Sequence, residues 1–251
     1  MLTKLSIYTR FAAAFNMIAL LGLTQVAAED TVVRFQTNAG RFDVLLNPTN
    51  NQNLQPLVDS FLDYVNSGRY DNTVMNRSAD LISGDDFVTQ WGGFVADVAT
   101  VDQLGTGGFS TVEEFDSVIL DADNDGEIDF DTSGLGNTIG TVAFALRFGG
   151  PNTSSSSVFV NLSDNLFLEE QGYVPFAVVQ DLAAFIDTIA DLPTFDLSSQ
   201  IGSPGNLAYT DVPILGQNRF VVVRRAFVIP EPGTLSLFLS VGSILVMRRK
   251  R

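Results

Sequence analysis

Residues 75–94 read MNRSADLISGDDFVTQWGGF and place one arginine, Arg77, ahead of an apolar run that leads to a glutamine, a tryptophan and two glycines. The chain around this stretch is acidic and contains no histidine and no cysteine. Chemistry that needs an imidazole or a thiolate is therefore excluded, and with it most nucleophilic triads and the common zinc and haem sites. A site in this stretch has to work through a guanidinium, an amide and apolar side chains.

The N-terminus has the pattern of a secretory signal peptide. Two basic residues precede an apolar run at 11–23, and Val26 and Ala28 occupy the −3 and −1 places of a small-residue cleavage site. We expect signal peptidase to cut after Ala28 and to remove residues 1–28. A buried helix or a retained anchor is the alternative, which the short apolar run disfavours because a comfortable span needs ~20 residues.

The C-terminus, residues 230–251, begins with Pro-Glu-Pro, continues with an apolar stretch at about 235–247 and closes with four basic residues. A basic end of this kind stays on the cytoplasmic side of a membrane. This tail resembles the PEP-CTERM sorting signal of exported proteins in Gram-negative bacteria. The resemblance implies temporary retention in the inner membrane through the tail, cleavage by an exosortase, and release to the cell surface or extracellular matrix. A plain membrane anchor is the alternative.

Residues 29–229 remain between the two processing sites, which is enough for one domain with a sizeable core. This part holds eight arginines, no lysine and 28 acidic residues, a balance of −20. So negative a domain argues against nucleic acid as a partner. It suits solubility outside the cell, or cation binding. Because the chain has no cysteine, no disulfide stabilises it, although export would permit one.

The spacing of apolar residues predicts many short strands and two helices. Two alternating runs at 31–37 and 41–46 predict a hairpin, because Asn38-Ala39-Gly40 between them favours a tight turn. Apolar residues at helical spacing predict helices over 54–65 and 181–191. Further strands are expected around 73–76, 87–90, 140–146, 156–162 and 219–229, with loops over 95–139 and 194–216. We therefore expect a mainly β domain, a closed antiparallel barrel capped by the two helices.

Six segments of this domain resemble, in order, the blocks of the cyclophilin family of peptidyl-prolyl isomerases. They are NAGRFDVLL, FLDYVNSGRYDNT, the arginine with FVTQWGGF, GTVAFA, GPNTSSSSVFV and NLFLEEQGYVPFAVV. The likeness runs from about residue 31 to 179, and the joint order and spacing of the blocks carry it. The resemblance implies an eight-stranded cyclophilin-like barrel in an isomerase that acts on proline-containing polypeptide segments, assists protein folding and requires no cofactor.

The resemblance also implies roles for individual residues. Arg77 matches the catalytic arginine, and Gln90 matches the glutamine that holds the guanidinium or the substrate backbone in place. Phe159 matches the apolar floor of the proline pocket, and Tyr173 stands where either histidine or tyrosine occurs. The full set of residues matched to substrate binding is Phe87, Val88, Ala145, Ser157, Phe159, Phe167, Leu168 and Tyr173.

A guanidinium suits this reaction. The bond before a proline rotates over a barrier of ~18–20 kcal/mol, because amide resonance must be broken. At the twisted state the prolyl nitrogen regains its lone pair, and a hydrogen-bond donor such as Arg77 can bind it. The planar ground state offers no such acceptor, so the donor binds the transition state more tightly than the substrate. No proton is transferred, which is consistent with the lack of histidine and cysteine.

Several positions depart from the family pattern. Ser157 stands where glutamine is usual, which removes a substrate hydrogen bond, and Leu146 replaces an asparagine. Trp91 interrupts the usual Gln-Gly-Gly, where it either extends the groove or packs inside. Residues 78–86 lengthen the stretch that follows the arginine, which predicts a larger loop beside the pocket. We expect weakened or retuned isomerase activity. The alternative is a non-catalytic cyclophilin-like binding or matrix protein of the cell surface.

An acidic stretch, DADNDGEIDFD at 121–131, is a second candidate site. Its spacing resembles an EF-hand calcium loop with a glycine at the sixth position. The expected Ca²⁺ ligands are Asp121, Asp123, Asp125, Glu127 through its carbonyl, and Asp129. Thr132 stands at the twelfth position, where a bidentate acid is usual, and a solvated acidic loop is the alternative. A hydrolase with paired carboxylates has little support, because no spacing singles out an acid–base pair.

Overall fold

The computed structural model describes residues 31–230 except 82, 130–133 and 148–149. The predicted signal peptide at 1–28 lies outside the described residues, and so does the predicted sorting tail beyond its first residue, Pro230. Within the described ranges, no helix combines the length and the apolar character that a membrane span requires.

The first two strands form the expected hairpin. β1 (Val32–Thr37) and β2 (Arg41–Leu46) pair antiparallel. The Thr37 N–H donates to the Gly40 carbonyl at 2.7 Å and closes the turn between them. Alternate residues of the hairpin, such as Phe35 and Val44, are fully buried, as a period of two predicts for a sheet with one face on the core.

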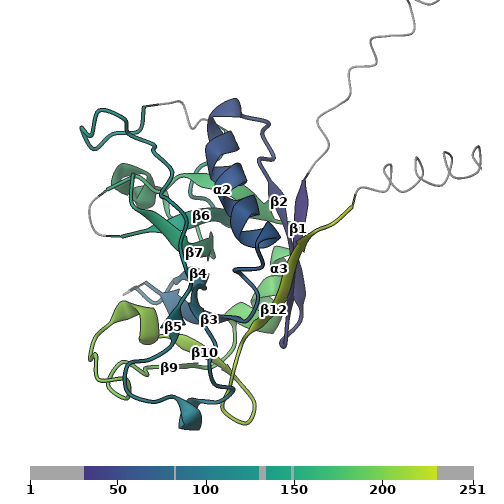
Figure 1. Cartoon of the computed structure of the whole chain (residues 1–251), viewed down its shortest axis with the longest axis vertical. Helices are drawn as coiled ribbons and strands as arrows, with labels where there is room; N and C mark the ends of the chain where they lie inside the picture. Colours follow the sequence, from purple (N-terminus) through teal and green to yellow (C-terminus); the bar gives the residue numbers. More distant parts are fainter. Residues whose placement is uncertain (1–30, 82, 130–133, 148–149, 231–251) are drawn as a thin grey trace, which may run out of the picture.

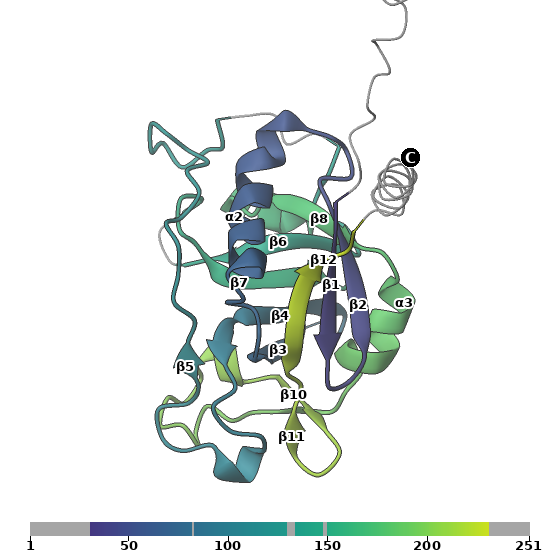
Figure 2. The ribbon, with the colours of Figure 1, turned by 45° about the vertical axis from the view of Figure 1, so that its right-hand side comes forward.

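Eight strands form one curled antiparallel sheet, in the order β12-β1-β2-β8-β6-β7-β4-β3, with β5 beside β4 (Figures 1 and 2). The mainly β prediction is confirmed. The remaining strands of this sheet are β3 (Thr73–Asp80), β4 (Asp86–Val95), β5 (Ser110–Thr111), β6 (Thr141–Leu146), β7 (Ser154–Asn161), β8 (Pro175–Val179) and β12 (Val223–Val228).

The prediction of a closed barrel is wrong. The strand order has two ends, β3 and β12, and among the described residues they form no ladder with each other. An isolated bridge between Val74 and Val222 and backbone hydrogen bonds from the Asn72 and Met75 N–H groups to the Val223 and Val221 carbonyls connect the two edges locally. The ladder does not continue because a different segment occupies the edge of β3. The Ser78 N–H, further along that edge, donates to the Asp211 carbonyl at 2.7 Å. The sheet is therefore a curled half-barrel.

Two helices pack on the concave core of this sheet. α2 (Gln55–Asn66) buries the face that its helical spacing predicted, including Leu57 and Phe61. α3 (Leu182–Phe185) is a single α-helical turn that continues as a π-helical segment, Ile186–Ala190. Short 3-10 turns occur at Gln52–Leu54, Val101–Gln103, Leu166–Gln171 and Leu207–Tyr209.

Trp91 packs inside this core and does not extend a groove. It is fully buried, with its ring centroid 5.6 Å from that of Phe35 and 5.4 Å from that of Phe42, both in edge-on contacts. Of the two interpretations of this tryptophan, the packing one is therefore supported.

The expected larger loop at 78–86 is also absent. Ser78 and Ala79 continue β3 and pair with Thr89 and Val88 of β4. The Leu81 N–H donates to the Asp85 carbonyl at 2.8 Å and closes the connection. The extra residues lengthen the β3–β4 hairpin, in which pairing continues to Asp80 and Asp86.

Residues 94–111 and 194–222, together with Val74 of β3, form a second, smaller core, which lies at the lower end of the molecule in Figure 1. It carries a three-stranded sheet of β11 (Arg219–Phe220), β10 (Val212–Leu215) and β9 (Thr194–Phe195). Its buried members are Val74, Leu104, Phe109, Leu197, Ile201, Tyr209, Val212, Ile214, Phe220 and Val222. The prediction of a loop over 194–216 is thus wrong, and this segment packs against β3.

Candidate active site

A row of residues crosses four neighbouring strands on the face of the sheet opposite to the main core. Arg77 of β3 lies opposite Gln90 of β4, which lies opposite Phe159 of β7. Phe159 in turn lies opposite Ala143 of β6. Directly opposite residues share one face of a sheet, and their chain neighbours such as Trp91 point to the other. Strand alternation therefore gathers these side chains on the outer face.

A groove of about 750 Å³ lies over this row. Its apolar floor is formed by Val88, Phe159 and Leu168, which together with the buried Ala143 make a cluster separate from the main core. The predicted site residues that line the groove are Arg77, Phe87, Val88, Gln90, Ala145, Phe159, Phe167, Leu168 and Tyr173. The lining is completed by Leu146, Arg147, Gly150, Gln171 and Leu207. The structure thus brings nearly all of the predicted set into one depression.

Ser157 is the predicted site residue that does not line the groove. It is buried on β7, and its Oγ lies only 2.1 Å from the position that a Cβ on Gly93 would take. Its N–H donates to the Ser155 Oγ at 3.2 Å. The short serine side chain therefore stays against the backbone of β4, and glycine at position 93 makes this close approach possible.

Arg77 lies in the wall of the groove with its side chain 19% exposed. Its guanidinium carbon is 5.7 Å from the centroid of the Phe87 ring. Burial lowers the pKa of Arg77, while the charge of Asp211, and that of Tyr173 once its phenol ionises at high pH, oppose that change. Arginine nevertheless stays protonated at physiological pH. The groove therefore holds a partly desolvated cation beside an apolar floor.

Gln90 and Tyr173 flank this cation. Among the described residues no hydrogen bond joins the Gln90 amide to the Arg77 guanidinium, although the two residues are opposite each other. The Tyr173 ring meets the Phe159 ring edge-on at 5.6 Å. Burial raises the pKa of Tyr173, with Arg77 opposing it, so the phenol is neutral at physiological pH. Both polar groups can therefore hydrogen-bond to a peptide in the groove.

Leu207 and Asp211 are among the neighbours of this site that the sequence analysis did not predict. Leu207, which is 63% exposed, lines the groove, and Asp211 lies behind the Arg77 guanidinium. Both belong to the segment that was expected to be a loop. The alternation of Val212 and Ile214 before a glycine is a weak strand signal that could have placed them on an ordered element.

The acidic stretch at 121–129 partly resembles the arrangement that its spacing predicts. Three of the five expected ligands have carboxylate oxygens within 4.8 Å of one another: Asp121, Asp123 and Asp129. The Asp125 carboxylate instead accepts the Glu127 N–H at 2.8 Å. Gly126 has φ +95° and donates its N–H to Asp121 Oδ2 at 2.9 Å, so the glycine turn of the pattern is present.

Comparison with known proteins gives a consistent result. Residues 32–207 match the family model described as cyclophilin type peptidyl-prolyl cis-trans isomerase/CLD. The chain is 31% identical over 171 residues to peptidyl-prolyl cis-trans isomerase cyp18 of Streptomyces antibioticus, covering 65% of this chain and 86% of that protein. It is 32% identical over 170 residues to peptidyl-prolyl cis-trans isomerase B of Escherichia coli strain K12, with the same two coverages.

A solved structure supports the fold. The cyclophilin type peptidyl-prolyl cis-trans isomerase cgd2_1660 of Cryptosporidium parvum matches with a TM-score of 0.52 and 18% identity, covering 81% of this chain and all of that one. A structure of the same protein in the presence of the dipeptide Ala-Pro matches with a TM-score of 0.50. Because the family model spans more than half of the chain, the protein belongs to the cyclophilin-type peptidyl-prolyl cis-trans isomerases, an enzyme family.

Proposed function

We propose that this chain catalyses rotation about X-Pro bonds, with Arg77 as the donor that binds the prolyl nitrogen in the twisted state. The observation that supports it best is the position of Arg77, a half-buried cation in the wall of a groove with an apolar floor. Phe159 and Leu168 form the part of this floor that would receive a pyrrolidine ring.

The groove supplies the other requirements of the reaction. Its apolar floor excludes water around the ring, and a hydrogen bond from a cation is stronger where water is excluded. The Gln90 amide would hold a backbone carbonyl of the substrate, so that the group on one side of the rotating bond stays fixed. The proton stays on Arg77 throughout. The reaction needs no cofactor, because no bond is made or broken other than hydrogen bonds.

The test is the rate of prolyl isomerisation in a short peptide, with the wild-type chain and Arg77→Ala. Removal of a transition-state donor typically lowers the rate by ~10²–10³-fold, and we expect kcat/KM to fall by about 10²-fold. Arg34→Ala is the matched control. Arg34 is also partly buried beside an aspartate, Asp43, but it lies on β1 and does not line the groove. Its loss should leave kcat/KM unchanged.

Equal rates for the wild type and Arg77→Ala would overturn the mechanism. If the wild type and Arg77→Ala were both inactive but still bound proline peptides, the chain would instead be the second candidate, a non-catalytic binding or matrix protein. That candidate is favoured by Ser157, which is withdrawn from the groove, and by Leu146, which lines the groove where an asparagine is usual in the family.

We further propose that the enzyme is exported and assists the folding of proteins at the cell surface. Uncatalysed X-Pro isomerisation takes tens to hundreds of seconds and can limit folding. The signal-peptide pattern at 1–28 and the Pro-Glu-Pro tail support export. N-terminal sequencing of the protein recovered from its native host tests this, because a mature chain that begins at Glu29 is expected and an intact N-terminus would contradict it.

A further inference from the structure

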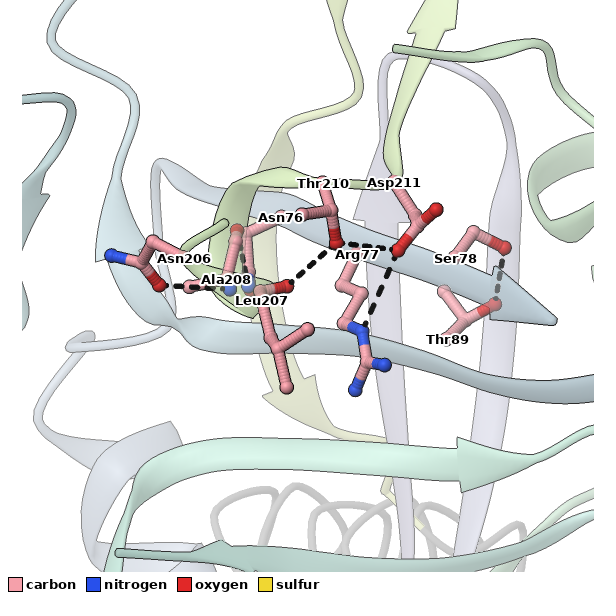
Figure 3. Close-up of polar contacts among 9 residues, drawn as sticks. All are labelled: Asn76, Arg77, Ser78, Thr89, Asn206, Leu207, Ala208, Thr210 and Asp211. Carbon is pink, nitrogen blue, oxygen red and sulfur yellow. Dashed lines mark hydrogen bonds and ion pairs between the residues drawn. The ribbon is translucent and has the colours of Figure 1, made fainter. Parts of the chain in front are cut away.

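We propose that Asp211 is a positioning residue that holds the Arg77 guanidinium in its working orientation. The proposal rests on the catalytic role of Arg77 given above. Asp211 Oδ2 lies 3.9 Å from Arg77 Nε. Figure 3 shows the two terminal nitrogens of the guanidinium on the side away from Asp211. The carboxylate therefore faces the back of the guanidinium and leaves its terminal N–H groups free to meet a substrate.

Asp211 is itself held in place by two hydrogen bonds, one to its carboxylate and one to its backbone carbonyl. The Thr210 Oγ1 donates to Asp211 Oδ2 at 2.7 Å (Figure 3). The backbone carbonyl of Asp211 accepts the Ser78 N–H of β3, one residue beyond Arg77, also at 2.7 Å. Because the anchor and the guanidinium sit at adjacent positions of one strand, the distance between the two charges is set by the fold.

The segment that carries Asp211 is fixed to β3 and to the second core. The Asn76 Nδ2 donates to the Ala208 carbonyl at 3.2 Å, and the Ala208 N–H donates to the Asn206 Oδ1 at 3.1 Å. Tyr209 is buried, and its hydroxyl accepts the Phe109 N–H at 3.0 Å. Hydrogen bonds and burial therefore connect the wall behind Arg77 to β3 and to the second core.

Arg77 needs such a partner for a physical reason. Its Nε is buried and has no hydrogen-bond acceptor among the described residues, and at 3.9 Å the carboxylate is too distant for a hydrogen bond. A long side chain in this position has many rotamers, and desolvation disfavours its charge. An opposite charge at short range counters that desolvation and favours the rotamer that places Nε toward it.

The experiment measures kcat and KM for peptide isomerisation in the full chain, with Asp211→Asn in the wild-type and in the Arg77→Ala background. We expect Asp211→Asn to lower kcat about tenfold, since misplacement of a catalytic group by 1 Å costs up to ~10²-fold. KM should change less than twofold. Asp211→Glu should recover part of the loss, and Thr210→Val should lower kcat by a smaller factor. Asp43→Asn, which removes the partner of Arg34, is the matched control and should leave kcat unchanged.

The double mutant decides between positioning and general stability. If Asp211 acts through Arg77, Asp211→Asn has no further effect when Arg77 is already alanine. An equal loss in both backgrounds, or an unchanged kcat in Asp211→Asn, would overturn the proposal. If Arg77→Ala lowers kcat while Asp211→Asn does not, only the positioning role fails. If Arg77→Ala retains the wild-type rate, the proposed mechanism and this inference fail together.

Discussion

Tyr70 shows, at the scale of one residue, a conflict between packing and hydrogen bonding. Its side chain is fully buried, and its ring lies 5.4 Å from that of Phe61 and 5.3 Å from that of Tyr64. Its hydroxyl has no hydrogen-bond partner in the described part of the chain. The ring therefore stabilises the core, whereas the buried hydroxyl costs free energy.

We expect Tyr70→Phe to increase the free energy of unfolding by about 1 kcal/mol, because it removes an unsatisfied buried hydroxyl and keeps the ring. Urea denaturation of the full chain measures this. Tyr209→Phe is the control, since the Tyr209 hydroxyl accepts the Phe109 N–H at 3.0 Å. That change should destabilise the protein by about 1 kcal/mol. A less stable Tyr70→Phe would show that the Tyr70 hydroxyl has a partner.

At the scale of elements, prediction from the sequence succeeded where the pattern is long and local. The hairpin at 31–46 and helix α2 were predicted because strict alternation and helical spacing leave few alternatives. The second helix was placed correctly, but its change to a π-helical segment at Ile186 has no local signal. The strands within 194–216 were missed because β9 and β10 are two and four residues long and depend on tertiary packing.

The residues of the site likewise fall into those that the sequence predicted and those that it did not. The residues of the groove floor lie on strands whose alternation and block order are visible in the sequence, so they were predicted together. Asp211 reaches Arg77, and Leu207 reaches the groove, only because the second core folds against β3. Ser157 was misplaced because its position depends on contact with Gly93, a residue on a different strand. Contacts between distant segments are what the sequence pattern does not encode.

Calcium binding by the acidic loop at 121–129 stays a prediction. The turn around Gly126 and the nearby carboxylates of Asp121, Asp123 and Asp129 agree with it. Weak extracellular calcium sites have dissociation constants of ~10⁻⁴–10⁻³ M, and we expect heat release in that range by titration calorimetry. Asp121→Asn should abolish the signal, and Asp59→Asn on α2 should not. An absence of heat at millimolar calcium would leave the stretch as a solvated acidic loop.

At the scale of the whole molecule, the groove differs in charge from the domain around it. Residues 29–229 carry a balance of −20, with eight arginines. Two of these, Arg77 and Arg147, line the groove, and no carboxylate does so among the described residues. Arg147 forms an ion pair with Glu114 and its side chain is 61% exposed, whereas the Arg77 side chain is 19% exposed, so Arg77 is the more buried of the two groove cations. A peptide that enters meets a positive wall in an otherwise negative protein.

The amino-acid composition also determines how the activity should depend on pH. The chain has no histidine and no cysteine, so no side chain has an ordinary pKa between about 5 and 8. Arg77 stays charged even though burial lowers its pKa. Burial raises the pKa of Tyr173 from its ordinary 10.0, so its phenol keeps its proton below that value. Each charge that faces the substrate is therefore constant across the neutral range.

We accordingly expect kcat/KM for peptide isomerisation to be flat from about pH 6 to pH 9. On the alkaline side, stability should fall above the ordinary tyrosine value of 10.0, where the unfolded chain releases a phenolic proton that buried Tyr70, with its raised pKa, still holds. Deprotonation then favours the unfolded state. The measurement is kcat/KM across pH 6–9 with urea midpoints across pH 8–11. A bell-shaped rate profile within the neutral range would reveal a titrating acid or base, and a hydrogen bond from Arg77 would no longer account for the rate.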